Sequence, residues 1–341
     1  PPGIYPIYVY GPSGFSAPVF VGVDCLPQVS MSKDIESLPL ALSGEVTGSS
    51  VVEARFEGKK GRKFTIDVEA IRLDSKLRPK LALLDPSGVQ IAWSQQMASI
   101  GGDARIHAVL PVDGEYLVQL RDAAYEGMTP GHFRLKLGEL RFADLVYPPA
   151  MQRNTASQLE LIRRGIDRLS HVDYVAPNAT GEFFAPIPGE HPLIGPTPRL
   201  SVTDRVEIVE RSETSGPIDV PQAPVGLNGR ISTAKESDVY RVAVVPGQKL
   251  RIEVQAAGLG SALDAVLAVH DDLGRVMQTV DVKGPKADPI KDVVVPDDVK
   301  QLSIKIHDIA RRGGADFIYR IAVSPIQAGY QLALHAPSVV L

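Results

Sequence analysis

Histidine often signals metal binding or acid–base catalysis, and this chain has seven. A zinc-protease site needs two histidines one helical turn apart, as in His-Glu-x-x-His. Neither that pair nor a His-x-His pair occurs in the sequence. We therefore predict ordinary strand and loop positions for all seven, which are His107, His132, His171, His191, His270, His307 and His335.

Serine and cysteine are the candidate nucleophiles, and neither has the setting that nucleophilic catalysis requires. A catalytic serine stands on a strained turn such as Gly-x-Ser-x-Gly with a base within reach, and this motif is absent. The nearest approach is Ser261, but an internal repeat aligns it with Ser75 in a predicted β-turn. Cys25 is the single cysteine and has no histidine near it. One thiol excludes an intrachain disulfide and multi-thiolate metal sites.

Acidic turns are the remaining candidate ligands, because calcium takes oxygen ligands from such turns. Paired aspartates at turns are common without a metal, so we predict no cofactor, with calcium as the one alternative. The glycine pairs lack the strand–loop–helix context of a phosphate site, and short basic pairs indicate solvated loops. The residues considered are Asp264, Asp271, Asp272, Asp297, Asp298, Gly258, Gly260, Gly313, Gly314, Lys59, Lys60, Arg311 and Arg312. The sequence thus predicts no catalytic, cofactor-binding or metal-ligating residue.

The elements that position these residues repeat within the chain. The alternating segment Lys63–Ala70 recurs 186 positions later as Lys249–Ala256. One offset held over so long a stretch indicates two copies of one module, near 38–139 and 223–325. The same offset relates Gly61 to Gly247, Ser75 to Ser261, Leu77 to Leu263, Leu81 to Leu267, Asp85 to Asp271, Gly88 to Gly274, Asp122 to Asp308, Gly127 to Gly313 and Arg134 to Arg320.

Each copy is predicted to be all-β. Strict alternation of polar and apolar residues indicates strands with one buried face, and turn sequences such as Asp85-Pro86-Ser87-Gly88 separate them. Short strands at regular spacing specify serial antiparallel sandwiches. In the first copy the predicted strands are Glu53–Phe56, Phe64–Ala70, Lys80–Leu84, Arg105–Val109, Glu115–Arg121 and His132–Leu137.

The rest of the chain belongs to other units. Residues 157–169 fit either a helix or a strand. A further strand pattern stands near each end of the chain. We expect the 341 residues to be a segment of a longer protein. The predicted division is 1–29, the end of a truncated immunoglobulin-like unit; 30–140, the first module; 141–221, an immunoglobulin-like sandwich; 222–326, the second module; and 327–341, the first strand of a following domain.

Composition narrows the function classes. A hydrophobic fraction of 44% and a charged fraction of 22% exclude wholesale disorder. The net charge of −4 provides no basic field for nucleic acid or an anionic membrane. No apolar run approaches the 18 residues of a membrane span. The 30 glycines and 28 prolines indicate many turns and disfavour an all-α enzyme.

The repeated module resembles the bacterial pre-peptidase C-terminal domain, a β-sandwich appended to secreted proteases and other exported proteins. The resemblance lies in Leu227–Ile231, Ser237–Val242 and Pro246–Leu250, and in Arg72–Pro79, Leu83–Gly88 and Pro111–Tyr116 of the first copy. The intervening unit, with Leu145-Val146-Tyr147-Pro148-Pro149, is similar to immunoglobulin-like TIG sandwiches, and residues 11–18 resemble the last strands of such a unit. The alternation is similar to that of large exported proteins of planctomycete-type bacteria.

Two departures from the family pattern bear on calcium, which some collagen-binding relatives hold through acidic linker residues. The acidic, Asn-containing linker is replaced by residues 29–34 in the first copy and by 210–213 in the second. The first copy also has Val52 and Ala54 where the second has Asp238 and Tyr240. Both departures count against calcium binding by this chain.

These observations predict a non-catalytic structural or interaction segment of an exported protein, acting at the cell surface or outside the cell. Its partners would be other protein subunits, in a fibre or surface layer, with no nucleic acid and no membrane insertion. The alternative is a polysaccharide- or collagen-binding accessory module of a secreted enzyme. Such sites place several aromatic residues on one face, whereas Trp93 is the single tryptophan and Tyr125 becomes Arg311 in the second copy. A catalytic domain elsewhere in the parent chain and a removable pro-region are further alternatives.

Overall fold

The structure is a computed structural model that describes residues 2–12, 14–97, 100–163, 170–210, 216–281 and 287–326. These residues form strands, turns and short 3₁₀ segments, and they contain no α-helix. The all-β prediction is therefore confirmed. Within the same ranges no helix has the length and apolar character that crossing a membrane requires.

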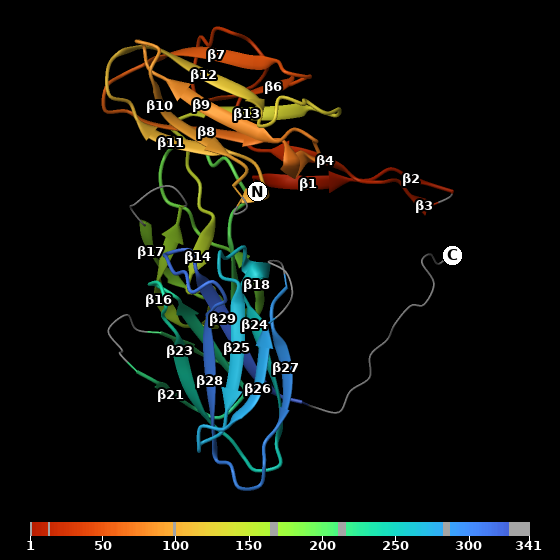
Figure 1. Ribbon diagram of the computed structural model, residues 1–341, viewed down its shortest axis with the longest axis vertical. Coiled ribbons are helices and arrows are strands. Elements are labelled where there is room, and N and C mark those ends of the chain that lie inside the picture. The colour runs from red at the N-terminus through yellow and green to blue at the C-terminus, as the bar shows by residue number, and fades with distance from the viewer. Residues whose placement is uncertain are drawn as a thin grey trace. The chain divides into compact units, whose positions relative to one another are not determined.

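The strands belong to two compact units, which are described one at a time (Figure 1). The first unit contains the described residues up to Asp144 and the segment Ile187–Thr197. The second unit contains the other described residues.

The first module is a sandwich of two sheets in the first unit. Its core residues alternate along the strands, so Ile66, Val68, Tyr116 and Leu120 are fully buried. The four-stranded sheet has the order β10 (Gln90–Gln95), β9 (Pro79–Leu84), β12 (Gly114–Asp122) and β7 (Val51–Gly58). The five-stranded sheet has the order β11 (Arg105–Val109), β8 (Lys63–Glu69), β13 (His132–Gly138), β6 (Leu40–Glu45) and β5 (Gln28–Ser30).

A β-hairpin precedes this module. Strands β1 (Gly3–Ile7) and β4 (Val19–Val23) pair antiparallel, and β2 (Tyr10–Gly11) pairs with β3 (Gly14–Phe15) near the tip. Figure 1 shows the hairpin reaching beyond the sandwich of the first unit. Strand β5 follows β4 and pairs in parallel with β6, which ties the hairpin to the module.

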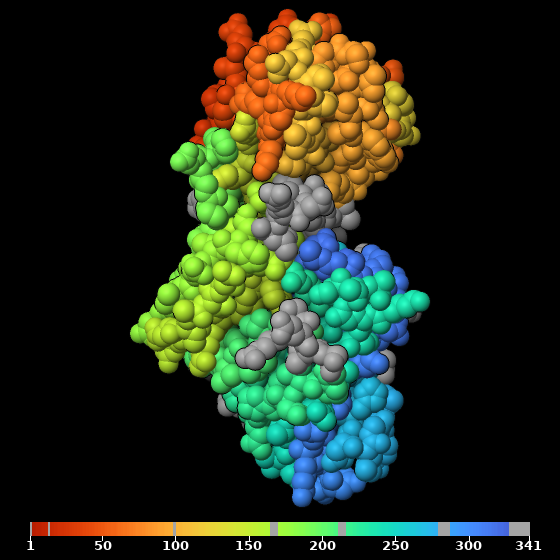
Figure 2. All heavy atoms as spheres, turned by 90° about the vertical axis from the view of Figure 1, so that its left-hand side faces the viewer, coloured from red at the N-terminus to blue at the C-terminus, as the bar shows by residue number. Residues whose placement is uncertain are grey.

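Charged residues on the outward face of β8 and β13 are also buried, unlike the usual solvated face of an antiparallel sheet. Asp67, Glu69, Arg134 and Lys136 are all less than a tenth exposed. Segments that precede and follow the module in the sequence cover these four side chains. One of them is the light-green segment 187–197 of the first unit in Figure 2. A buried charge is costly unless an opposite charge pairs with it, so the covering segments must supply partners.

Lys136 is the centre of this buried ionic network. Its Nζ lies 2.5 Å from Glu69 Oε1 and 3.3 Å from Asp24 Oδ2, and it donates to the main-chain oxygen of Ile194. Burial alone would raise the pKa of Asp67, but Coulombic attraction by Arg72, Arg105 and Lys136 holds it well below its usual range. The network therefore bonds the hairpin and the segment 187–197 to one sheet face.

The second unit contains a small sandwich and the second module. The small sandwich has two three-stranded sheets, β14 (Leu145–Tyr147), β16 (Ala156–Ile162), β17 (Ser170–Val175) and β15 (Ala150–Gln152), β19 (Arg199–Thr203), β18 (Gly181–Phe184). Of the segment 157–169 that fitted either helix or strand, the part up to Ile162 is strand, and 164–169 lie outside the described residues.

The second module has two five-stranded sheets around a core of its own. One has the order β20 (Val206–Val209), β22 (Val225–Arg230), β29 (Ile318–Pro325), β24 (Lys249–Gln255) and β27 (Ile290–Val294). The other has the order β21 (Ile218–Val220), β23 (Asp238–Ala243), β28 (Gln301–Asp308), β25 (Ala265–His270) and β26 (Val276–Asp281).

The repeat extends beyond the modules into the segments that precede them. Strands β8, β9 and β10 recur as β24, β25 and β26 at the offset of 186. In addition, the hairpin β1–β4 followed by β5 matches β18–β19 followed by β20, because β5 and β20 both pair in parallel with the first strand of their module. The five-part division of the chain stays a prediction, and residues 327–341 lie outside the described part.

Replacing Lys136 tests the ionic network. We expect Lys136→Met to lower the free energy of unfolding by about 3–5 kcal/mol, since Glu69 and Asp24 lose one of the two buried cations that they share and the network is left with an uncompensated negative charge. Urea denaturation, with hydrogen exchange of β8 as a local readout, measures the loss. The control Arg55→Met breaks an exposed pair with Glu115, 3.9 Å away, and should change stability by less than about 0.5 kcal/mol. Equal small effects of both variants would contradict this account.

Candidate functional site

A chain of buried hydroxyl groups ends on a carboxylate in the second module. Asp238 and Tyr240 lie on the same face of β23, since they are two residues apart, and Tyr319 comes from β29 of the facing sheet. Tyr319 donates to Asp238 Oδ2 at 2.6 Å, and the hydroxyls of Tyr240 and Tyr319 are 2.9 Å apart. Tyr319 can therefore accept from Tyr240 while it donates to Asp238. Gly229 leaves the space for both rings, because a Cβ there would lie 2.2 Å from Tyr319 Oη.

Two glutamates complete a carboxylate cluster with Asp238. Glu210 follows β20, and Glu236 lies in the loop before β23. One carboxylate oxygen of each residue can be chosen so that all three lie within 4.8 Å of one another. Glu210 also accepts from the Arg230 amide at 3.0 Å, and Glu236 accepts from the Thr233 amide and hydroxyl. These bonds hold the carboxylates in place despite their mutual repulsion.

The cluster changes the acidity of its members. Burial and repulsion by Glu210 raise the pKa of Asp238 to about 7, although the hydrogen bond from Tyr319 opposes the shift. Burial raises the pKa of Glu210 as well, and the nearby Glu236 adds to the effect. Near neutral pH the cluster is therefore poised to hold either a proton or a cation.

The first module shows that the sandwich does not need this cluster. Strand register places Met31, Val52, Ala54 and Phe133 at the positions of Glu210, Asp238, Tyr240 and Tyr319, respectively. All four are apolar and pack in or against the core of the first module. Because an apolar set builds the same fold, the polar set in the second copy is a candidate functional site.

The cluster supplies only some of the oxygen ligands that a divalent cation needs. Glu210 stands in the linker that precedes the second module. Calcium takes six to eight oxygen ligands, of which three carboxylates supply a fraction. The arrangement is equally satisfied by a proton shared between Asp238 and Glu210, whose carboxyl groups hydrogen-bond to each other. A cation is therefore one of two possible occupants.

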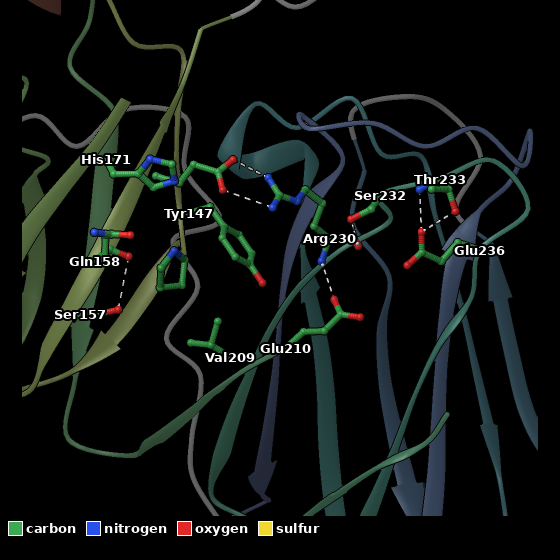
Figure 3. A pocket seen from close by; sticks show the side chains of 12 residues that line it. Tyr147, Ser157, Gln158, His171, Val209, Glu210, Arg230, Ser232, Thr233 and Glu236 are labelled. Carbon is green, nitrogen blue, oxygen red and sulfur yellow. Dashed lines mark hydrogen bonds and ion pairs between the residues drawn. The ribbon is translucent and has the colours of Figure 1, made fainter. Parts of the chain in front are cut away.

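A polar cavity of about 440 Å³ opens beside Glu210 and Glu236. Figure 3 shows Ser157, Gln158 and His171 on the strands of the small sandwich, facing Arg230 and Glu236 on the module. The cavity wall also contains Tyr147, Pro148, Glu160, Val209, Glu210, Ser232 and Thr233.

Arg230 organises the wall of this cavity. Its Nη1 lies 2.5 Å from Glu160 Oε1 and its Nη2 lies 3.2 Å from Oε2, so the pair is bidentate. The guanidinium also lies 4.8 Å from the centre of the Tyr147 ring. Burial raises the pKa of Tyr147, which keeps the hydroxyl protonated. The wall thus offers one aromatic ring, an ion pair and several neutral hydrogen-bonding groups.

The serines considered as nucleophiles have structural roles. Ser261 accepts from the Leu263 amide and donates to the Asp316 carbonyl. Ser75 makes the same two bonds, with Leu77 and Pro130. Two equivalent turns of this kind account for the hydroxyl at both positions.

One of the aspartates considered as calcium ligands, Asp271, caps a turn, as Asp85 does at the equivalent place in the first copy. Asp271 accepts from the amides of Leu273 and Arg275, and Asp85 accepts from Ser87 and Val89 in the first copy. In each copy one aspartate oxygen therefore binds main-chain amides. The sequence pattern indicated these turns but missed Glu236 and Tyr319, for which the only sequence signal was the change at Asp238 and Tyr240 between the copies.

The other candidate residues are dispersed. Cys25 is exposed. Trp93 and Tyr125 are exposed too, but Lys80 lies 5.4 Å from one ring and Arg121 lies 3.9 Å from the other. His171 is the one histidine in the wall of the cavity, and His335 lies outside the described residues.

Comparison with known proteins gives remote structural likenesses. No protein-family model and no curated protein sequence matches the chain. The pre-peptidase C-terminal domain of collagenase from Bacillus anthracis is 11% identical, with a TM-score of 0.25, covering 33% of this chain and 100% of that one. The periplasmic g-type lysozyme inhibitor PliG of Aeromonas hydrophila is 15% identical, with a TM-score of 0.24, covering 33% and 98%.

A third similar structure is SGBP-B of the Bacteroides ovatus mixed-linkage glucan utilization locus, in complex with a heptasaccharide. It is 11% identical, with a TM-score of 0.19, covering 96% of this chain and 84% of that one. With TM-scores this low, these likenesses do not identify a family.

The raised pKa of Asp238 predicts a specific pH dependence. Unfolded aspartate ionises near pH 3.8, whereas folded Asp238 keeps its proton up to about pH 7. At Asp238 the folded state therefore binds more protons in this window, and the contribution of this group to stability is greatest below about pH 4 and is lost as the pH rises through about 7. In the presence of a chelator, Asp238→Asn should match the native chain at pH 4 and exceed its stability by roughly 2–4 kcal/mol at pH 8.

Thermal and urea unfolding across this pH range measure the difference. The control Asp219→Asn removes an exposed carboxylate paired with Arg241 and should leave the pH profile unchanged. Parallel pH profiles for the native chain and Asp238→Asn would refute the shifted ionisation. Added calcium separates the two occupants, because a bound cation would stabilise the native chain and not Asp238→Asn.

Proposed function

We propose that this chain is a non-catalytic structural and interaction segment of an exported protein, in which buried polar joints fix each sandwich module to the segment that precedes it. Its partners are other protein subunits at the cell surface or outside the cell. The observation that carries the proposal is the recurrence of one joint, with an arginine at the same place, in both units.

In the second unit the joint is centred on Glu207, which lies between the small sandwich and the module. Arg320 of β29 donates to both Glu207 oxygens, at 2.6 and 3.1 Å. Asn228 of the module and Thr203 of β19 donate to the same carboxylate at 3.0 and 2.9 Å. The Glu207 side chain is only 2% exposed, so the pair is shielded from water and little screened by salt.

The joint in the first unit uses the equivalent arginine. Arg134 Nε donates to Gln28 Oε1 at 2.8 Å, and Gln28 stands at the position of Glu207. Arg134 also donates to Asp24 at 2.7 Å and to Glu69 at 3.1 Å. The charge of the linker residue differs between the copies, but in both a buried arginine bonds to the linker.

The linkers themselves are ordered as strands. Strands β5 and β20 each pair in parallel with the first strand of the following module. Domain boundaries usually fall in exposed, flexible linkers with few contacts, and these two linkers are instead bonded through main chain and side chains. Such joints suit a segment in which each module keeps a fixed position relative to the strands that precede it, as a fibre, a surface layer or a rigid spacer requires.

The polysaccharide-binding alternative is favoured by one observation, the polar cavity beside Tyr147. A tyrosine ring next to an ion pair and amide groups is a surface on which a sugar ring can stack and hydrogen-bond. Titration of the chain with soluble polysaccharides, repeated with Tyr147→Ala, distinguishes this function from the structural one. Saturable binding that Tyr147→Ala abolishes would favour the alternative.

Removing the arginine tests the joint in the second unit. We expect Arg320→Met to lower the stability of the unit by about 3–5 kcal/mol, because Glu207 is left buried without a cation. It should also speed proteolysis in the linker 204–210 at least tenfold. The control Arg251→Met, on the neighbouring strand β24, breaks an exposed pair with Asp292 of β27 and should do neither. Slow linker proteolysis in Arg320→Met would contradict the rigid joint.

A further inference from the structure

The β1–β4 hairpin carries an apolar face that its own unit leaves in contact with solvent. Val21 and Val23 on β4 are 37% and 46% exposed, and Ile7 on β1 is 54% exposed. At the tip, Tyr10 packs on Phe15 with ring centres 5.1 Å apart, and both remain exposed. A run of exposed apolar residues on one element marks an interaction site.

The chain contains a second version of this hairpin with the same face buried. Gly3 pairs with Val23 in the first hairpin, as Gly181 pairs with Val202 in the second. Val21 and Val23 therefore correspond to Leu200 and Val202, which are 0% and 2% exposed. Since the two hairpins occupy the same place before their modules, the difference lies in what covers them.

Two features cover the second hairpin. Strand β15 pairs in parallel with β19, where the Ser201 amide donates to the Pro149 carbonyl and the Arg153 amide donates to the Thr203 carbonyl. The sheet β14–β16–β17 then supplies an apolar inner face, with Leu159 and Leu161 buried. Both features come from the single stretch 145–177.

The first hairpin has neither feature among the described residues. Strand β4 pairs with β1 on one edge and also contacts the 3₁₀ segment Ile71–Leu73, and no described strand pairs with its other edge. Gly22 stands at the position of Ser201, so its amide is the one that an added parallel strand would engage. An open edge beside an uncovered apolar face is the geometry of strand addition.

We propose that the β1–β4 hairpin is a docking surface for a β half-sandwich with the chemistry of residues 145–177. Its second strand, the counterpart of β15, adds in parallel to the free edge of β4, and its leucine-lined sheet covers Val21 and Val23. An isolated peptide strand would satisfy the edge and leave the valines in water. A second copy of this chain is a poorer occupant, because its own 145–177 is held by β18–β19.

A graft tests this surface directly. Residues 145–180 are joined to Gly3 of the full chain, so that Thr180 leads into Gly3 as it naturally leads into Gly181. We expect amide exchange in residues 19–23 to slow at least tenfold relative to the ungrafted chain, as measured by hydrogen-exchange mass spectrometry. The matched control carries Leu159→Lys and Leu161→Lys in the grafted copy only, and its β4 should exchange as fast as in the ungrafted chain.

Each outcome decides the proposal. Slow exchange in the graft but not in the control supports it, whereas equal rates in both overturn it. Slow exchange of β4 in the ungrafted chain, with a dimeric mass by sedimentation, overturns it in favour of a second copy.

A graft-free test uses Val21→Ser, which should leave Tm unchanged while Leu200→Ser lowers it by several degrees. Equal losses would show that the β4 face is already covered. The surface is separate from the arginine joints, so the two proposals fail independently.

Discussion

Each module buries an arginine on its last strand, and the need to pair that buried charge is the constraint from which the rest of the structure follows. Removing a guanidinium from water costs several kcal/mol, so Arg134 and Arg320 must find partners inside the protein. The modules alone do not provide enough of them. The partners Asp24, Gln28 and Glu207 lie in the preceding segment, which must therefore run along the module as β5 or β20.

The strands could be predicted from the sequence because alternation is a local signal. The segment Lys63–Ala70 places Phe64, Ile66 and Val68 on one face, and that face is the core. The burial of Asp67 and Glu69 on the other face could not be predicted in the same way. Charged residues at alternate positions normally face solvent, and nothing near them in the sequence shows that a hairpin some forty residues earlier covers them.

The sequence indicated only part of the carboxylate cluster. The pair Asp238 and Tyr240 stood out because the first copy lacks it, yet the pattern did not connect it to Glu236 or Tyr319. Their meeting depends on the stacking of two sheets and on the path of a linker, which are non-local properties. The correlated change of four positions to apolar residues in the first copy is a stronger signal. The offset of 186 relates three of these pairs, and only the pair of Met31 and Glu210 emerges when strand register aligns the copies.

The two copies differ in the chemistry of the residues next to their joints. Glu210 follows the joint residue Glu207 by three positions, so an ionisable cluster adjoins one joint, whereas Met31 follows Gln28 at the other. A change in the protonation of this cluster alters the charge beside the joint of the second module, whereas an apolar set occupies the equivalent positions of the first module. The two copies therefore share an equivalent arginine connection and differ in whether an ionisable cluster lies next to it.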